Sequence, residues 1–93
     1  MIDLCLETGR IIPLVYRENH EQLEKWGVQD LDPFQWLAFA TEELGELSAA
    51  IADWHFREGM PEPVIKEAIQ TATLCLKIAE MFQNLRPSKG GER

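Results

Sequence analysis

The amino-acid sequence predicts an all-α protein with three helices, of which the second and third are long and antiparallel. Three stretches carry apolar residues at three- and four-residue spacing, which indicates helices. Proline and glycine lie between these stretches and separate them. The chain has 93 residues, enough for one small domain, which we expect over 1–84 with a flexible tail over 85–93.

The first helix is expected from about Pro13 to Trp26. Proline suits the first turn of a helix, where its missing N–H needs no partner, and Gly27 provides a C-terminal stop. For residues 1–10, an extended arm and an additional helical turn both remain open. The helical spacing is carried by Ile12, Val15, Tyr16, Leu23 and Trp26.

The second helix has the clearest start signal in the chain. Asp32 is a good N-cap, Pro33 fits the first helical position, and Gln35 completes a capping box. We expect this helix to run to about Glu58, with Gly59 as its stop. Its apolar stripe is predicted to consist of Leu37, Ala40, Leu44, Leu47, Ile51 and Trp54.

The third helix is expected from about Val64 to Gln83 or Asn84, after the break set by Pro61 and Pro63. Apolar side chains cover most of its circumference, which is typical of a helix buried on most sides. Three helices cannot cover it alone, so we expect a homodimer whose paired helices form a four-helix core. The narrow polar strip of this helix consists of Lys66, Thr73, Lys77 and Glu80.

The composition excludes several classes of partner. The net charge of −7 argues against a nucleic-acid-binding surface, which needs a basic patch. No stretch reaches the roughly 18 apolar residues of a membrane span, so a membrane is not an expected partner either. Cys5 and Cys75 lack metal-binding or redox spacing, and we expect buried free thiols in a cytoplasmic protein.

Acidic side chains on the second and third helices are the strongest functional signal. Glu43 and Glu46 are three residues apart and share one side of a helix turn. Glu67 falls on the apolar side of the third helix, where an unpaired carboxylate is costly. A shared Mg²⁺ or Mn²⁺ would supply the missing counter-charge, because these ions prefer oxygen ligands. A solvated acidic face, or an arginine of another chain paired with Glu67, remains an alternative.

The stretch Trp36-Leu37-Ala38-Phe39-Ala40-Thr41-Glu42-Glu43-Leu44-Gly45-Glu46, followed by Glu67-Ala68-Ile69-Gln70, resembles the MazG-like nucleotide pyrophosphohydrolases. Their signature is EExxE, a spacer and ExxD, and the resemblance extends over roughly residues 20–82. It implies an all-α fold, dimers or tetramers, and Mg²⁺-dependent hydrolysis of nucleoside triphosphates. The products would be the monophosphate and pyrophosphate, in house-cleaning of the nucleotide pool.

The resemblance also implies roles for individual residues. Glu43, Glu46, Glu67 and Gln70 occupy the metal-binding positions of the signature, while Glu42 or Glu46 would orient the attacking water as general base. Candidates for phosphate contacts are Lys25, Arg57 and Lys66, with an ordinary surface cation as the alternative for each. Trp36 is expected to stack on a base or to pack in an interface, and Gln29 to read a base edge.

Gln70 departs from the signature, which has Asp at this position. An amide oxygen can coordinate a hard cation, but it brings no charge and cannot act as a base. We therefore expect weaker metal binding than in the full signature. The departure favours a second hypothesis, a non-catalytic helical dimer that binds a nucleotide or a protein partner.

Overall fold

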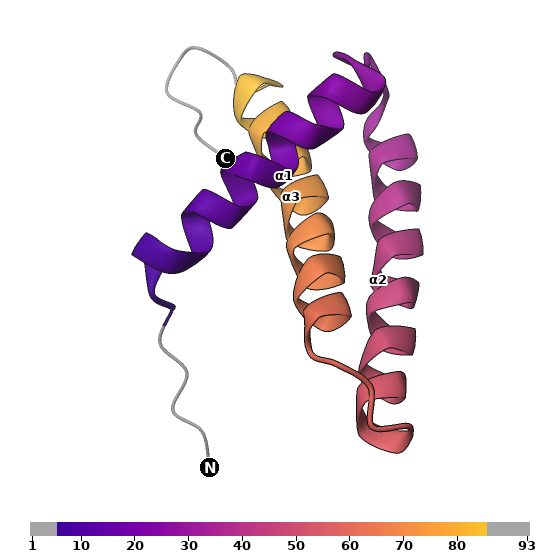
Figure 1. The fold of residues 1–93 in the computed structure, drawn as a ribbon. Coiled ribbons are helices and arrows are strands. Elements are labelled where there is room, and N and C mark those ends of the chain that lie inside the picture. The colour runs from indigo at the N-terminus through magenta and orange to yellow at the C-terminus, as the bar shows by residue number, and fades with distance from the viewer. Residues whose placement is uncertain (1–5, 86–93) are drawn as a thin grey trace.

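The computed structural model describes residues 6–85, which form three α-helices and contain no β-strand. These are α1 (Thr8–Trp26), α2 (Pro33–Phe56) and α3 (Glu62–Leu85). Helices α2 and α3 lie antiparallel and pack along most of their length, while α1 crosses α3 obliquely (Figure 1). The predicted all-α class and three-helix organisation are confirmed. No helix within this part of the chain is long and apolar enough to cross a membrane.

Helix α1 begins at Thr8, five residues before the predicted start, and Pro13 lies inside it. The first turn is closed by backbone bonds from Arg10 and Ile11 to the Glu7 carbonyl, at 2.9 and 3.0 Å. An ion pair between Arg10 and Glu7 adds to this turn. The additional helical turn left open for residues 1–10 is therefore present over residues 8–10, and residues 1–5 lie outside the described part.

Helix α2 begins as predicted. The Asp32 side chain accepts from the Gln35 N–H at 2.8 Å, and the Gln35 side chain accepts from the Asp32 N–H at 3.0 Å. This reciprocal capping box satisfies two backbone donors that the first turn would leave without partners. Because the signal is local, the sequence locates this helix start to the residue.

The end of α2 comes two residues before the predicted end. The Arg57 and Gly59 N–H groups both donate to the Asp53 carbonyl, at 2.9 and 3.1 Å, and Glu58 adopts a positive φ of 55°. A Cβ at Gly59 would lie 3.2 Å from the Asp53 oxygen, a tighter contact than is usual, so the close approach of the chain favours glycine here. The chain therefore leaves the helix where Gly59 passes close to the Asp53 carbonyl, and Glu58 adopts the left-handed conformation.

Helix α3 begins at Glu62 and includes Pro63 in its first turn, two residues before the predicted start at Val64. Proline is tolerated there because the N–H it lacks would have no intrahelical partner. The helix continues to Leu85, a residue that the sequence assigned to the tail; residues 86–93 lie outside the described part.

The core lies between α2 and α3 and is built on Trp36, Ala40 and Leu74. The predicted apolar stripe of α2 is only partly correct: Ala40 is buried and Leu47 is half-buried, whereas Leu37, Leu44, Ile51 and Trp54 are exposed. Helix α3 packs on the side of α2 that carries Trp36, Ala40 and Glu43, which leaves four of the six stripe residues exposed in the protomer.

The predicted polar strip of α3 is also corrected. Thr73 is only 1% exposed, and its hydroxyl donates to the Ile69 carbonyl at 2.8 Å. Lys77 is half-buried, and its ammonium donates a hydrogen bond to Gln22 on α1. Helix α1 therefore covers part of this strip. Cys75 was expected to be buried and is instead an exposed free thiol, while Cys5 lies outside the described residues.

Candidate functional site

Three carboxylates from two helices meet where the first half of α3 faces the middle of α2. Glu43 and Glu46 lie about one turn apart on α2, and Glu67 lies in the second turn of α3. One oxygen of each carboxylate lies within 4.8 Å of the others. We refer to Glu43, Glu46 and Glu67 as the carboxylate cluster. Its geometry brings together residues that are distant in sequence, as the helical phase of Glu67 predicted.

The electrostatics of the cluster are unfavourable without a cation or a proton. Burial, a side-chain hydrogen bond with Glu67 and the charges of Glu46, Glu67 and Glu42 raise the pKa of Glu43 to about 7. The Glu43 carboxyl therefore holds a proton far more readily than a solvated glutamate does. That proton provides the donor for the Glu43–Glu67 contact and relieves part of the repulsion.

Gln70, one turn after Glu67 on α3, further reduces the repulsion between the carboxylates. Its amide forms hydrogen bonds with them only when its nitrogen points toward them. It then donates to Glu43 Oε1 at 2.7 Å and to Glu67 Oε1 at 3.0 Å. Coordination of a cation by Gln70 requires the opposite orientation, with the oxygen turned toward the cluster. By rotating its amide, Gln70 can donate to the carboxylates in the metal-free site or coordinate a cation through its oxygen.

No basic side chain neutralises the cluster within residues 6–85. The ion pairs of this part join Arg10 to Glu7, His20 to Glu24 and Arg57 to Asp53, and none involves a cluster residue. Three carboxylates with an amide beside them are a donor set that fits a hard cation such as Mg²⁺ or Mn²⁺. The residues present therefore fit the metal that the sequence pattern implied.

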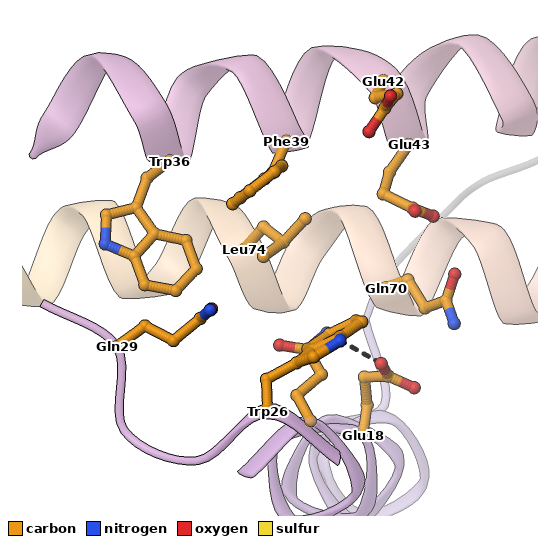
Figure 2. Close-up of a pocket in the computed structure, with 10 residues that line it drawn as sticks. Glu18, Trp26, Gln29, Trp36, Phe39, Glu42, Glu43, Gln70 and Leu74 are labelled. Atoms are coloured by element: carbon orange, nitrogen blue, oxygen red, sulfur yellow. Dashed lines mark hydrogen bonds between the residues drawn. The ribbon is translucent and has the colours of Figure 1, made fainter. Parts of the chain in front are cut away.

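A cavity of about 240 Å³ opens beside the cluster, between α1 and the α2–α3 pair (Figure 2). Trp36 and Phe39 meet edge to face in its wall, with ring centroids 6.2 Å apart. Glu42, Glu43 and Gln70 close one end of the cavity, so the cavity and the cluster share a boundary. The lining consists of Glu18, Gln22, Trp26, Gln29, Trp36, Phe39, Glu42, Glu43, Gln70 and Leu74.

Most of the residues predicted for the site converge on this region. The metal-binding candidates Glu43, Glu46, Glu67 and Gln70 lie together, and Glu42 lines the cavity next to them. The two base-contact candidates, Gln29 and Trp36, line the same cavity. Trp36 is also part of the core, so the packing role weighed for it is present alongside its place in the cavity wall.

The three cations predicted to contact phosphate lie outside the cavity lining in this protomer. Lys25 lies 4.9 Å from the centre of the Trp26 ring, and it is exposed. Arg57 pairs with Asp53 at 3.0 Å at the far end of α2. Lys66 lines a neighbouring groove between α1 and α3, which shares Glu18 with the aromatic cavity. None of the three lines the cavity.

The sequence reasoning missed the contribution of α1 to the cavity. Glu18, Gln22 and Trp26 recur every four residues along α1 and all line the cavity, and Phe39 on α2 joins them. Lys77 was also missed as a site neighbour, although its ammonium lies 5.2 Å from the centre of the Trp36 ring. The available signal was that Glu18 and Gln22 are polar residues that share one side of α1 with Trp26 at four-residue spacing.

Comparisons of this chain with protein-family models, curated proteins and solved structures find no match.

Proposed function

We propose that this protein is a Mg²⁺-dependent nucleotide pyrophosphohydrolase, with Mn²⁺ as a second usable ion and the cytoplasm as its compartment. It would hydrolyse a nucleoside or deoxynucleoside triphosphate to the monophosphate and pyrophosphate. One observation carries the proposal: a carboxylate cluster without a basic partner, within residues 6–85, adjoins a cavity with aromatic walls. Cluster and cavity together suit a ligand that has phosphates at one end and a planar base at the other.

Glu43, Glu46 and Glu67 would hold the cation, with the Gln70 oxygen as a fourth ligand after rotation of its amide. A bound Mg²⁺ neutralises phosphate charge and lowers the pKa of an attacking water. The three carboxylates bring enough negative charge to make the site selective for cations. Gln70 brings none, so we expect the affinity to fall below that of a site with four carboxylates.

Glu42 is the better candidate for the general base of the two residues considered from the sequence. Glu42 lines the cavity, whereas the Glu46 carboxylate belongs to the cluster. A glutamate that is not occupied by the cation keeps free lone pairs to accept a proton from water. Trp26, Trp36 and Phe39 would hold the base and exclude water from that end of the cavity.

The proposal includes a two-fold dimer with a four-helix core. Leu37, Leu44 and Ile51 lie seven residues apart on α2 and are 53%, 54% and 45% exposed. This spacing places them along one face of the helix, as in helix–helix seams. A second copy packed on this face would bury these three side chains and complete the four-helix core.

A second candidate function is favoured by the two hydrogen bonds of Gln70. These hydrogen bonds reduce the repulsion between the Glu43 and Glu67 carboxylates without any cation. Such a site is expected in a MazG-like dimer that binds a nucleotide or a protein partner without turnover. In that case the cavity binds its ligand and pyrophosphate is not released.

Pyrophosphate release from a panel of ribo- and deoxyribonucleoside triphosphates, with Mg²⁺ and with Mn²⁺, tests the catalytic proposal. We expect release from at least one nucleotide, its loss in Glu43→Gln, and its retention in Glu21→Gln, which changes an exposed glutamate of α1 outside the cavity lining. If no nucleotide yields pyrophosphate but calorimetry detects binding, the non-catalytic function is the correct one.

A further inference from the structure

Three polar side chains form a connected chain from α3 across α1 to the cavity. Lys77 Nζ donates to Gln22 Oε1, and Gln22 Nε2 donates to Glu18 Oε2 at 2.7 Å. Gln22 is 6% exposed and has both ends of its amide engaged, so its orientation is fixed. Burial lowers the pKa of Lys77, while the negative charge of Glu18 acts in the opposite direction and favours the ammonium. The chain therefore holds the Glu18 carboxylate in place.

Glu18 is half-buried and lines the cavity from the α1 side, across from Gln70 and Glu43 (Figure 2). An ionised carboxylate accepts hydrogen bonds at about four positions on its two oxygens and donates none. Gln22 occupies one of these positions. Within residues 6–85 no other hydrogen bond reaches this carboxylate, so its remaining positions could accept from N–H groups of a ligand in the cavity.

The size of the cavity limits that ligand. Its volume of about 240 Å³ lies below the roughly 300–1,000 Å³ that is usual for drug-sized ligands. A single planar ring system between Trp26, Trp36 and Phe39 matches this volume better than a whole nucleotide does. The phosphates of a nucleotide would then extend past Glu42 and Glu43 toward the carboxylate cluster.

We propose that Glu18 is the base-reading residue and that it selects guanine nucleotides, an inference that rests on the proposed nucleotide-binding function. Guanine has a ring N–H directly beside an exocyclic amino group, and these two donors match the two oxygens of a carboxylate. Adenine and cytosine place a ring-nitrogen acceptor beside their amino group, which repels a carboxylate. Uracil and thymine flank their one ring N–H with two carbonyl oxygens. A residue that only accepts hydrogen bonds therefore favours guanine.

Gln22 and Lys77 are positioning residues in this scheme, since they act through Glu18. They also connect α1 to α3, so a loss of stability in their variants does not separate a structural role from a role in recognition. Discrimination between two ligands that differ by one donor does separate the two roles. Guanosine and inosine are such a pair, because inosine lacks only the exocyclic amino group.

Calorimetric titration of the full chain, without metal, with guanosine and with inosine tests the proposal. Nucleosides carry no phosphate, so neither hydrolysis nor metal binding contributes. We expect guanosine to bind about tenfold more tightly than inosine, the size of one hydrogen bond to a charged group. Adenosine, cytidine and uridine should bind more weakly than guanosine.

Glu18→Gln should weaken guanosine binding by about tenfold or more and remove the preference over inosine, because the amide replaces one acceptor with a donor. Glu18→Asp keeps the charge and should retain the preference at reduced affinity. Glu21→Gln is the matched control on the same helix and should change neither value. Circular dichroism of each variant verifies that the helices are intact.

Equal affinities for guanosine and inosine, unchanged binding in Glu18→Gln, or no nucleoside binding at millimolar concentration would each overturn the proposal. Failure of the catalytic proposal is a different result: selective, Glu18-dependent guanosine binding without pyrophosphate release from any triphosphate. Conversely, equal release from all triphosphates, unaffected by Glu18→Gln, would leave catalysis standing and remove Glu18 as the base-reading residue.

Discussion

The carboxyl groups of Glu43 on α2 and Glu67 on α3 form a side-chain hydrogen bond across the helix interface, with Glu46 close to both. Two glutamates can approach in this way only when they share a proton or a cation. The pair therefore couples three measurable properties of the protein: its stability, its affinity for metal and its dependence on pH.

Glu43→Gln should stabilise the metal-free protein above neutral pH. The pKa of Glu43 is raised to about 7 in the folded state from an ordinary value of 4.5, so folding favours the protonated form. The stability of the wild type should fall as pH rises from about 4.5 through about 7, because the folded state must release a proton that the unfolded state has already lost. Glutamine has no such proton to release.

Thermal unfolding in a metal chelator at pH 5 and pH 8 measures this effect. For a domain of this size, each kcal/mol shifts the unfolding midpoint by about 4–8 °C, and we expect a rise of a few degrees for Glu43→Gln over the wild type at pH 8. At pH 5 the difference should be smaller. A variant less stable than the wild type at both pH values would contradict the charge repulsion described for the cluster.

Metal binding should strengthen with increasing pH up to about 7 and then level off. Below that pH, a cation must displace the proton held by Glu43, so binding releases protons. Titration with Mn²⁺ at pH 5.5, 6.5 and 7.5, in two buffers with different ionisation enthalpies, measures both the affinity and the proton release. An affinity that does not vary over this range would exclude Glu43 as a ligand.

Gln70→Asp should increase the affinity for Mg²⁺ and reduce the stability of the metal-free protein. The substitution removes the amide that donates to Glu43 and Glu67 and places a fourth negative charge beside them. We expect an affinity gain of about tenfold or more, measured by calorimetry, together with a lower unfolding midpoint in chelator.

Gln83→Asp is the matched control for that experiment, since Gln83 is exposed on the same helix and distant in sequence from the cluster. The control should leave the metal affinity unchanged. A lower metal affinity in Gln70→Asp than in the wild type would argue that the amide oxygen at this position is itself the preferred ligand.

Leu44→Glu should convert the proposed dimer to a monomer without unfolding the helices. Leu44 is 54% exposed in the protomer, so the core between α2 and α3 does not depend on it. Sedimentation velocity gives the assembly state, and circular dichroism gives the helix content. Leu85→Glu, at the end of α3 and 66% exposed, is the control and should remain dimeric. A wild-type protein that sediments as a monomer would contradict the proposed four-helix core.

Local signals in the sequence were sufficient to identify three helices and to place the start of α2. The capping box of Asp32 and Gln35 depends on contacts three residues apart, so it could be recognised without any tertiary information. The start of α1 was missed by five residues because no side chain caps it and Pro13 looked like a first-turn residue. The helix continues through Pro13 toward Glu7, whose carbonyl closes the first turn.

The carboxylate cluster could be predicted, because it depends on the positions of its residues around their own helices. The contribution of α1 to the cavity was missed, because it depends on how α1 crosses α3. Glu67 lies on the apolar side of its helix, and this position in the pattern predicted its meeting with Glu43 and Glu46. Glu18 and Gln22 share one side of α1 with Trp26, but the environment of that side includes Lys77, which is 55 positions beyond Gln22. The periodicity of α1 alone does not show which residues of α3 it meets.

The sequence by itself determined three helices, the caps at Asp32 and Gly27, and the side of its own helix on which each carboxylate of the cluster lies. These features follow from interactions within a few residues and from the fixed geometry of an α-helix. Only the tertiary structure decided which residues of the α2 stripe are buried, that the three predicted cations do not line the cavity, and that Glu18 does. Those outcomes depend on the rotation of one helix against another, which is set by the packing of side chains distant in sequence.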